Sequence, residues 1–332
     1  MVWRAAVIGC GRMGHLFARQ APHLGVYAHA QAYAACPATR LVAVCDPDPD
    51  LARDCAQTWG AAAQFQDPRR LLAEAAPQIV SICSPDPTHY ELALAALETP
   101  GLRALFMEKP LALDLAQAAR VVDLARAQGV VLAVNYLRRY CRGFQAVRQS
   151  LAAGDLGPVQ AVSGFYTKGV AHNGSHWFDL VRFLLDEITW VRAWPGPDPD
   201  PDDPGLEVEL GLAGGATARL HACRAEAYSV FELDILGETG RLRLVDAAMR
   251  WERWQVGDSP WYQGYRVLRP RRPLSASLKN ATLAAVRDLA ACLDRGGEPL
   301  CSGRDALAAL AVAQAARESA AAGGQPRPPA RF

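Results

Sequence analysis

The sequence predicts an α/β protein with two domains. The first is expected to hold a parallel sheet covered by helices, and the second to be an α+β domain with an open, mostly antiparallel sheet. Three observations predict this arrangement. The chain has 332 residues, which suits two hydrophobic cores better than one. Strand-like and helical runs alternate up to residue 135, and short strands separated by turn residues dominate afterwards.

In the first domain, residues 1–135, apolar and β-branched runs are each followed by helical segments, which is typical of a sheet covered on both faces. The expected strands are Val2–Ile8, Arg40–Cys45, Gln78–Cys83, Ala104–Met107 and Val130–Asn135. The expected helices are Leu51–Trp59, Pro68–Ala75, His89–Leu97 and Leu115–Gln128.

The second domain, residues 136–332, is expected to begin with a helix over 141–153, a strand over 159–166 and a helix over 176–185. Strands are then expected over 206–212, 216–223, 230–236, 241–245 and 249–256, joined by tight turns. The proline-rich segments 194–205 and 266–272 are interpreted as loops, since proline supplies no ladder donor. A final helix is expected over 303–321, with packing against the first domain left open, followed by a frayed tail.

Composition excludes several classes of protein. Hydrophobic residues make up 51% of the chain and the formal net charge is +1, with no basic stripe that would suit nucleic acid. No apolar run approaches the ~20 residues that span a bilayer, and the first strand begins too early for a signal peptide. Nine scattered cysteines show no metal-like spacing. We therefore expect reduced thiols, no metal, no membrane role and a cytoplasmic location.

A glycine-rich turn follows the first strand directly. Its glycines, Gly9, Gly11 and Gly14, suit a tight turn, a close backbone approach to a pyrophosphate and tight helix packing. The amides around Arg12 and Met13 begin the helix on which the phosphate would rest. The turn therefore predicts a dinucleotide-binding Rossmann domain.

The second strand ends in Asp46, which can accept hydrogen bonds from the adenosine ribose and would repel a 2′-phosphate. The expected cofactor is therefore NAD, with NADP less favoured, although Arg12 and Arg53 could neutralise a phosphate. Asp46 can also be interpreted as a turn-forming residue before Pro47.

Asp46 comes 32 positions after Gly14, where a compact unit needs only about 20, so an insertion over His15–Tyr27 is expected. If it lies near the glycine turn, His23, His29 and Tyr33 could face a substrate. The alternative is a longer helix with ordinary surface histidines.

These motifs and several later ones follow expected strands and together resemble the Gfo/Idh/MocA family of oxidoreductases. They are Gly9–Gly14, Asp46, Ser84–His89, Glu108–Lys109–Pro110, Asn135–Tyr140, Gly154–Gly157, Gly174–Asp179 and Leu300–Gly303. The resemblance covers nearly the whole chain. It implies a Rossmann domain followed by an open-sheet domain whose other face commonly makes oligomer contacts.

The resemblance also implies residue roles. Lys109 would reach the nicotinamide and the reacting hydroxyl, and His176 would assist proton transfer. The loop that contains Ser84, Pro85 and His89 would pass the nicotinamide half of the cofactor. These three residues, together with Glu108, are therefore expected to bind the cofactor.

The chemistry of these residues suits alcohol oxidation, in which a hydride leaves carbon while a proton leaves oxygen. Either Lys109 takes the proton, or it stays cationic while His176 does so. Where many family members place an aspartate four residues before the histidine, this chain has His172, so a different substrate or proton path is expected. In a helix, His172, His176 and Asp179 would share one face, which makes His172 a further catalytic candidate.

The leading interpretation is an NAD(H)-dependent dehydrogenase or reductase that acts on a secondary alcohol of a sugar, cyclitol or sugar derivative. A redox-neutral enzyme with tightly bound NAD and a non-catalytic dinucleotide sensor are the alternatives. A homodimer or homotetramer is also expected, because alternating apolar residues over 206–212 and 216–223 would favour burial against a second copy.

Overall fold

The computed structural model describes residues 2–332, and the chain forms two compact units. The first contains the residues up to Cys141 together with Leu278–Leu307, and the second contains Arg142–Ser277 and Ala308–Phe332. This differs from the contiguous boundary expected at residue 135. The chain returns to the first unit because helix α9 (Ala281–Arg295) buries its apolar face there and contacts α2 (His29–Ala35).

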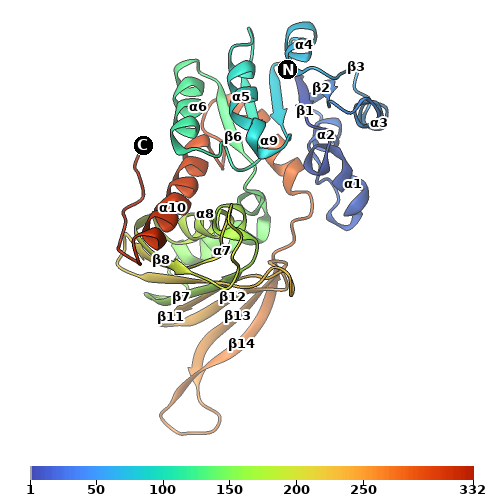
Figure 1. The fold of residues 1–332 in the computed structure, drawn as a ribbon. Coiled ribbons are helices and arrows are strands. Elements are labelled where there is room, and N and C mark those ends of the chain that lie inside the picture. Colours follow the sequence, from blue (N-terminus) through green and yellow to red (C-terminus); the bar gives the residue numbers. More distant parts are fainter. Residues whose placement is uncertain (1) are drawn as a thin grey trace. The chain divides into compact units, whose positions relative to one another are not determined.

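The first unit contains a six-stranded parallel sheet with the order β3-β2-β1-β4-β5-β6, and the connecting helices pack against it (Figure 1). The strands are β1 (Trp3–Ile8), β2 (Thr39–Cys45), β3 (Ala63–Phe65), β4 (Ile79–Ile82), β5 (Ala104–Met107) and β6 (Val131–Val134). The connecting helices are α3 (Pro49–Trp59), α4 (Pro68–Ala75), α5 (His89–Leu97) and α6 (Leu115–Ala127). Every strand and helix expected in this domain is confirmed, whereas β3, α2 and α9 of this unit were not expected.

Aspartate side chains explain where three of these helices begin. Asp48 accepts the Asp50 amide at 2.9 Å before α3, and Asp67 accepts the Arg69 amide at 2.9 Å before α4. Asp114 does the same for the Gln117 amide before α6, also at 2.9 Å. Each carboxylate satisfies a backbone donor that has no partner inside the helix.

The register of the sheet brings the carboxyl ends of five strands into one row. Ile8 pairs with Cys45 on one side and with Ile82 on the other, and the pairing continues through Met107 to Val134. The residues that follow these positions therefore lie along the same edge. In an open parallel sheet of this order, this edge is where ligands bind, at the point between β1 and β4 where the strand order reverses.

The segment of the expected insertion, His15–Tyr27, forms short helical turns before α2. They are the end of η1 (Arg12–Leu16), which begins within the glycine turn, and then α1 (Phe17–Gln20) and η2 (Pro22–Leu24). Two side chains join the insertion to α3: His15 Nε2 lies 2.8 Å from Asp54, and Arg19 donates to Asp54 at 2.8 Å. The hydrogen bond from Arg19 and, to a smaller extent, the one with His15 lower the pKa of Asp54 to about 2.

The second unit contains an eight-stranded sheet with the order β14-β13-β12-β11-β7-β10-β9-β8, antiparallel except between β7 and β10 (Figure 1). The strands are β7 (Val159–Tyr166), β8 (Ile188–Pro195), β9 (Leu206–Leu212), β10 (Thr217–Ala222), β11 (Phe231–Gly237), β12 (Gly240–Val245), β13 (Arg250–Asp258) and β14 (Arg266–Ser275). The helices are α7 (Arg142–Ala152), α8 (Ser175–Leu184) and most of α10 (Gly303–Ala321). The expected open, mostly antiparallel sheet is confirmed.

Two local expectations for this domain are wrong. Residues 266–272 form part of β14 rather than a loop, because an edge strand has only one hydrogen-bonded neighbour and tolerates Pro270 and Pro273. The tail is not frayed up to Arg327, because Arg327 and Val191 exchange two backbone hydrogen bonds of 2.8 Å. Ser319 Oγ also donates to the carbonyl oxygen of Gln325 at 2.6 Å.

The reason given for oligomer formation is also wrong. The alternating apolar residues of β9 and β10 are already buried within the unit, Leu210 and Leu220 completely. The opposite face of these strands carries charged pairs instead, in which Arg219 contacts Glu209 at 3.1 Å. Packing of the unit's own helices therefore covers the face that was expected to be exposed.

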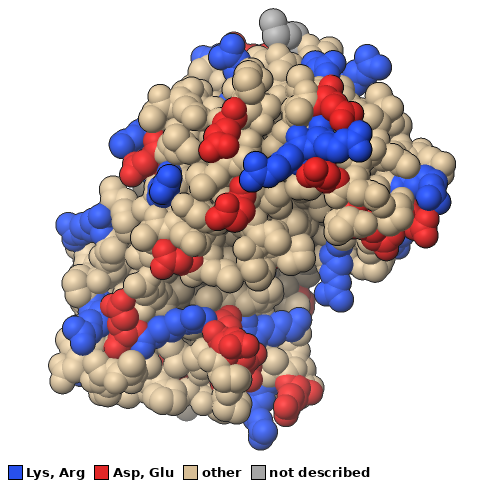
Figure 2. All heavy atoms as spheres, turned by 45° about the horizontal axis from the view of Figure 1, so that its top comes forward, with Lys and Arg blue, Asp and Glu red and all other residues tan. Residues whose placement is uncertain are grey.

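Among residues 2–332, no helix is both long enough and apolar enough to cross a membrane. Figure 2 shows Lys and Arg side chains interspersed with Asp and Glu on the visible face of the molecule. The positive charge on this face is therefore not gathered into one extended patch.

Candidate active site

The glycine turn after β1 is packed closely on one side and open on the other. Gly9 has φ +94°, and a Cβ on it would lie 2.5 Å from the Ser84 amide nitrogen. A Cβ on Gly14 would lie 1.9 Å from the Gly9 carbonyl oxygen. A Cβ on Gly11, in contrast, would meet nothing within 4 Å. Gly9 and Gly14 are thus required by the fold, whereas Gly11 borders unfilled space where a phosphate could approach the backbone.

This difference predicts two distinct phenotypes. Gly14→Ala is expected to lower the melting temperature of the ligand-free protein, because its Cβ overlaps a backbone oxygen. Gly11→Ala is expected to leave that temperature unchanged and to raise the Kd for NADH, because its methyl group fills the open side. Scanning calorimetry and NADH titration measure the two quantities. Equal loss of stability in both variants would contradict the assignment of Gly11.

Asp46, at the carboxyl end of β2, makes the contacts expected of a turn-forming residue. Its carboxylate accepts the Cys10 amide at 2.7 Å and the Asp48 amide at 3.0 Å. It therefore joins the glycine turn to the start of the next connection, as a turn-forming aspartate does. Each carboxylate oxygen can accept more than one hydrogen bond, so these contacts leave acceptor capacity for a ribose.

The loop after β4 is held by its own side chains. Ser84 Oγ lies 2.6 Å from Thr88 Oγ1, and the Thr88 amide donates to the Pro85 carbonyl at 2.9 Å. His89 is fully buried, with Nδ1 2.6 Å from the Pro110 carbonyl and Nε2 2.9 Å from the Ser84 carbonyl. The His89 ring therefore connects this loop to the loop after β5.

Glu108 follows β5 directly, and its side chain is only 13% exposed. Its Oε1 atom lies 3.0 Å from His29 Nε2 and accepts Asn135 Nδ2 at 2.6 Å. Burial raises the pKa of Glu108, but the His29 and Asn135 hydrogen bonds and the nearby Lys109 charge outweigh it and hold the pKa below its ordinary value. An ionised carboxylate thus lies beside Lys109 in the chain, where the Lys109–Pro110 peptide is cis.

A buried chain of polar groups continues behind Glu108. His29 Nδ1 lies 2.9 Å from Ser81 Oγ, which in turn lies 2.8 Å from the Tyr33 hydroxyl. Both His29 and Tyr33 are completely buried, whereas His23 is exposed. The interpretation of His29 as an ordinary surface histidine is therefore wrong, since its ring is buried and pairs with Glu108. The sequence offered no signal for its pairing with Glu108.

The histidine segment belongs to the second unit. His172 lies in a π-helical turn, η5 (Gly169–Gly174), and His176 lies in the first turn of α8. The helix expected from residue 176 is confirmed as α8 (Ser175–Leu184), and the segment that contains His172 is a π-helical turn rather than a regular α-helix. His172 is exposed, His176 is partly buried and Asp179 is buried.

The residues along the sheet edge of the first unit fit a nicotinamide dinucleotide. The open side of Gly11 accommodates a phosphate, and Asp46 has oxygen acceptors that suit ribose hydroxyls. Asn135 Oδ1 is buried and has no hydrogen-bond partner among residues 2–332, so it is available to an amide donor at the same edge. Within the same range, no group of three or more His, Cys, Asp or Glu residues could hold a metal ion.

Fold and site together define an oxidoreductase of the two-domain, dinucleotide-dependent class. The family model described as an oxidoreductase family with an NAD-binding Rossmann fold matches residues 3–136. The model of the same family's carboxyl-terminal alpha/beta domain matches residues 151–326. The chain therefore belongs to the Gfo/Idh/MocA oxidoreductase family, and its amino-terminal domain is an NAD-binding domain.

Named relatives and solved structures agree with this assignment. The chain is 30% identical to D-glucoside 3-dehydrogenase of Escherichia coli K12 over 204 residues, which cover 58% of this chain and 54% of that protein. It is 28% identical to inositol 2-dehydrogenase of Rhizobium meliloti 1021 over 353 residues, which cover 97% and 98%. A levoglucosan dehydrogenase in complex with NADH and levoglucosan has the same fold, with a TM-score of 0.83, 18% identity and full coverage of both chains.

Proposed function

We propose that this protein is an NAD(H)-dependent dehydrogenase or reductase that acts on a secondary alcohol of a sugar, a cyclitol or a sugar derivative. One observation supports this most strongly: the strand register places the positions after Ile8, Cys45, Ile82, Met107 and Val134 along a single edge. This edge thus gathers the glycine turn, Asp46, the loop after β4, Glu108–Lys109 and Asn135. The named relatives, which act on glucosides and inositol, support the substrate class.

NAD, when bound, supplies the acceptor or donor of the hydride, and the chain's own residues manage the proton and the charge. Lys109 is assigned to the reacting hydroxyl, where its ammonium group favours the developing alkoxide or its amine accepts the proton. Glu108, held by His29 and Asn135, restricts the backbone that carries Lys109. His176 is assigned to proton transfer, and His172 is a second candidate.

We assign the remaining candidate residues to binding of the cofactor. Gly9, Gly11, Arg12, Met13 and Gly14 form the pyrophosphate turn, and Asp46 selects NAD over NADP through the ribose hydroxyls. Ser84 and Pro85 border the nicotinamide half. His89 supports that loop from beneath, because both of its ring nitrogens already contact carbonyl oxygens.

A substrate panel tests this proposal directly. Purified protein is mixed with NAD⁺ and glucosides, inositols, anhydrosugars and aldoses, and absorbance at the NADH band is followed. At least one class is expected to reduce NAD⁺ in a stoichiometric reaction, and NADP⁺ is expected to be the poorer acceptor. The absence of reduction with every class, and of NADH oxidation with the corresponding keto compounds, would refute the proposal.

We further infer a reducing compartment such as the cytoplasm, because all nine cysteines are free thiols and seven of them are buried. A homodimer or homotetramer remains a prediction that the family resemblance supports. The charged face of the second sheet, rather than its apolar face, would then supply the contact.

A further inference from the structure

The Pro- and Asp-rich loop between β8 and β9 has a defined structure. The Gly196 amide donates to the Gly205 carbonyl at 2.9 Å and closes the loop at its base. Asp200 Oδ1 accepts the amides of Asp202 at 2.9 Å and Asp203 at 3.3 Å. These bonds form a turn that fixes the backbone of Asp203.

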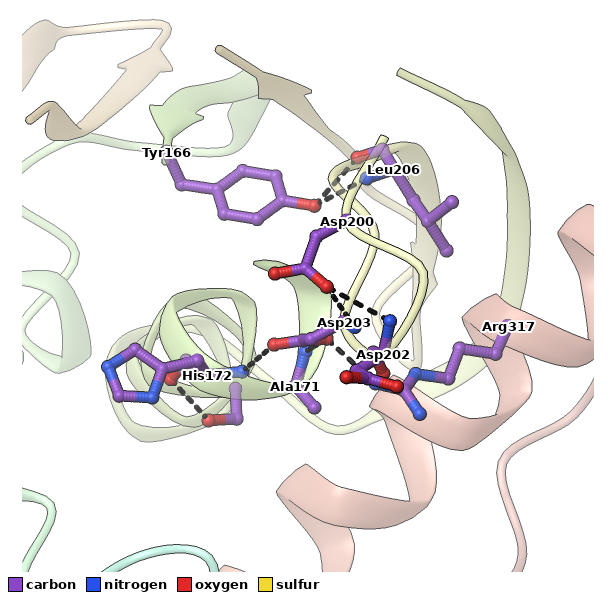
Figure 3. Close-up of polar contacts among 9 residues, drawn as sticks. Tyr166, Ala171, His172, Asp200, Asp202, Asp203, Leu206 and Arg317 are labelled. Carbon is purple, nitrogen blue, oxygen red and sulfur yellow. Dashed lines mark hydrogen bonds and ion pairs between the residues drawn. The ribbon is translucent and has the colours of Figure 1, made fainter. Parts of the chain in front are cut away.

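The side chain of Asp203 binds the beginning of the histidine segment (Figure 3). Its Oδ1 atom accepts the Ala171 amide and its Oδ2 atom accepts the His172 amide, both at 2.8 Å. The Val170 amide donates to the neighbouring Pro204 carbonyl at 3.0 Å. The loop thus satisfies three consecutive amides of η5.

These three amides have no acceptor within η5 itself. The Asn173 amide is the one that bonds back to the Lys168 carbonyl, at 3.3 Å, so the preceding amides need partners from elsewhere. Lys168 and Gly169 have φ of +67° and +73°, which turns the chain so that these amides point toward the loop. A Cβ on Gly169 would lie 2.1 Å from Asp203 Oδ2, so the glycine and the aspartate fit together.

Arg317 of α10 fixes the carboxylate from the other side. Its Nη2 atom donates to Asp203 Oδ1 at 2.8 Å and to the Asp202 carbonyl at 2.9 Å (Figure 3). The Asp203 side chain is 22% exposed, so water screens this pair only in part. Asp203 therefore connects the loop, η5 and α10 within one unit.

We propose that Asp203 is a positioning residue for the reaction: by binding the amides of Ala171 and His172, it sets the orientation of the His172 and His176 side chains. This inference rests on the proposed function of the two histidines. The carboxylate oxygens of Asp203 bind the Ala171 and His172 amides and Arg317, so Asp203 acts on the reaction through the histidine segment.

The test compares Asp203→Asn with the matched control Asp202→Asn. The two substitutions remove the same charge from adjacent positions, but the exposed Asp202 uses only its backbone in the contact with Arg317. In Asp203→Asn, an NH₂ group replaces one carboxylate oxygen. This donor then faces the backbone N–H of Ala171 or His172, which loses its acceptor. Because a misplacement of about 1 Å can cost about 10²-fold in rate, kcat is expected to fall by about 10- to 100-fold with KM for NAD⁺ unchanged. The control should keep the kcat of the unmodified protein.

A double-mutant cycle shows through which side chain the effect passes. If Asp203 acts by positioning a histidine, Asp203→Asn adds no further loss of kcat once that histidine has been replaced. The loss should therefore disappear in at least one of the two backgrounds, His176→Gln or His172→Gln. An equal loss of kcat in all three backgrounds would overturn the proposal, since it would indicate general damage to the unit. Thermal unfolding of each variant reports that damage separately.

A spectroscopic measurement keeps the test independent of turnover. The imidazole ¹H–¹³C NMR signals are assigned with the two glutamine variants and compared between the unmodified protein, Asp203→Asn and Asp202→Asn. Shifts of the His172 and His176 signals in Asp203→Asn alone support positioning, and unchanged signals overturn it. If the substrate panel detects no reaction, the proposed function fails, whereas this NMR comparison still decides the role of Asp203.

Discussion

Replacing Lys109 with methionine is expected to lower kcat by about 10²–10⁴-fold, the range that a positioned proton donor or acceptor contributes. The Kd for NADH is expected to change little, because the glycine turn and Asp46 carry most of the proposed contacts with the cofactor. Stopped-flow measurement of NADH formation, together with NADH titration, checks both values. Arg126→Met removes the same charge from the exposed surface of α6 and serves as the control. More than a tenth of the original kcat in Lys109→Met would contradict a catalytic role.

Lys109→Arg separates the two roles that remain open for this lysine. Arginine keeps the positive charge but does not lose its proton in proteins. If Lys109 acts as a fixed cation, the arginine variant recovers part of the rate that the methionine variant loses. If Lys109 accepts the proton, both variants are equally slow.

Replacing His29 with leucine is expected to destabilise the protein by about 3 kcal/mol, because it removes one hydrogen-bond partner of a buried carboxylate. Asn135 still donates to Glu108 in this variant. The loss of stability is therefore expected at the lower end of the range of about 3–5 kcal/mol that removal of one partner of a buried ion pair costs. His23→Leu is the matched control, since His23 belongs to the same region of the chain but is exposed. Chemical unfolding at neutral pH measures the difference between the two variants.

The size of this effect depends on pH in a defined direction. The pKa of Glu108 in the folded protein lies below its ordinary value, so the unfolded chain binds its proton at higher pH than the folded protein does. The stabilisation is therefore complete above the ordinary carboxyl pKa and is lost as the pH falls through the lowered value. The gap between the unmodified protein and His29→Leu is expected to be largest near pH 7 and to narrow below about pH 4.5. A gap that widens on acidification would contradict this assignment.

Local patterns were enough to predict most of the fold. The strand at Trp3–Ile8, the glycine turn and the helices that begin after Asp48, Asp67 and Asp114 all depend on residues close together in the sequence. The predictions failed where a segment depends on distant neighbours. Strand β14 tolerates its prolines because it lies at an edge, and α9 joins the first unit because α2 offers a surface to it.

The residues of the candidate site also fall into two groups: those that local patterns predicted and those whose role depends on distant neighbours. Gly9, Gly14 and Asp46 were identified because their motifs follow strands, and the ends of parallel strands meet at one edge whatever the intervening chain does. The role of Lys109 was implied by the family resemblance of Glu108–Lys109–Pro110. The roles of His29 and Tyr33 could not be predicted in this way. Whether a histidine is buried depends on what packs against it, and His29 meets a carboxylate 79 residues away.

The order of strand, glycine turn and acidic residue, and with it the class of cofactor, could be read from local patterns, because these features require only short-range geometry. The pairing of polar groups depends on the packed fold: Glu108 pairs with His29, and Asp203 pairs with the amide of His172, 31 residues away. A polar side chain removed from water takes the partner that the packed fold brings within about 3 Å, and sequence spacing does not specify that partner.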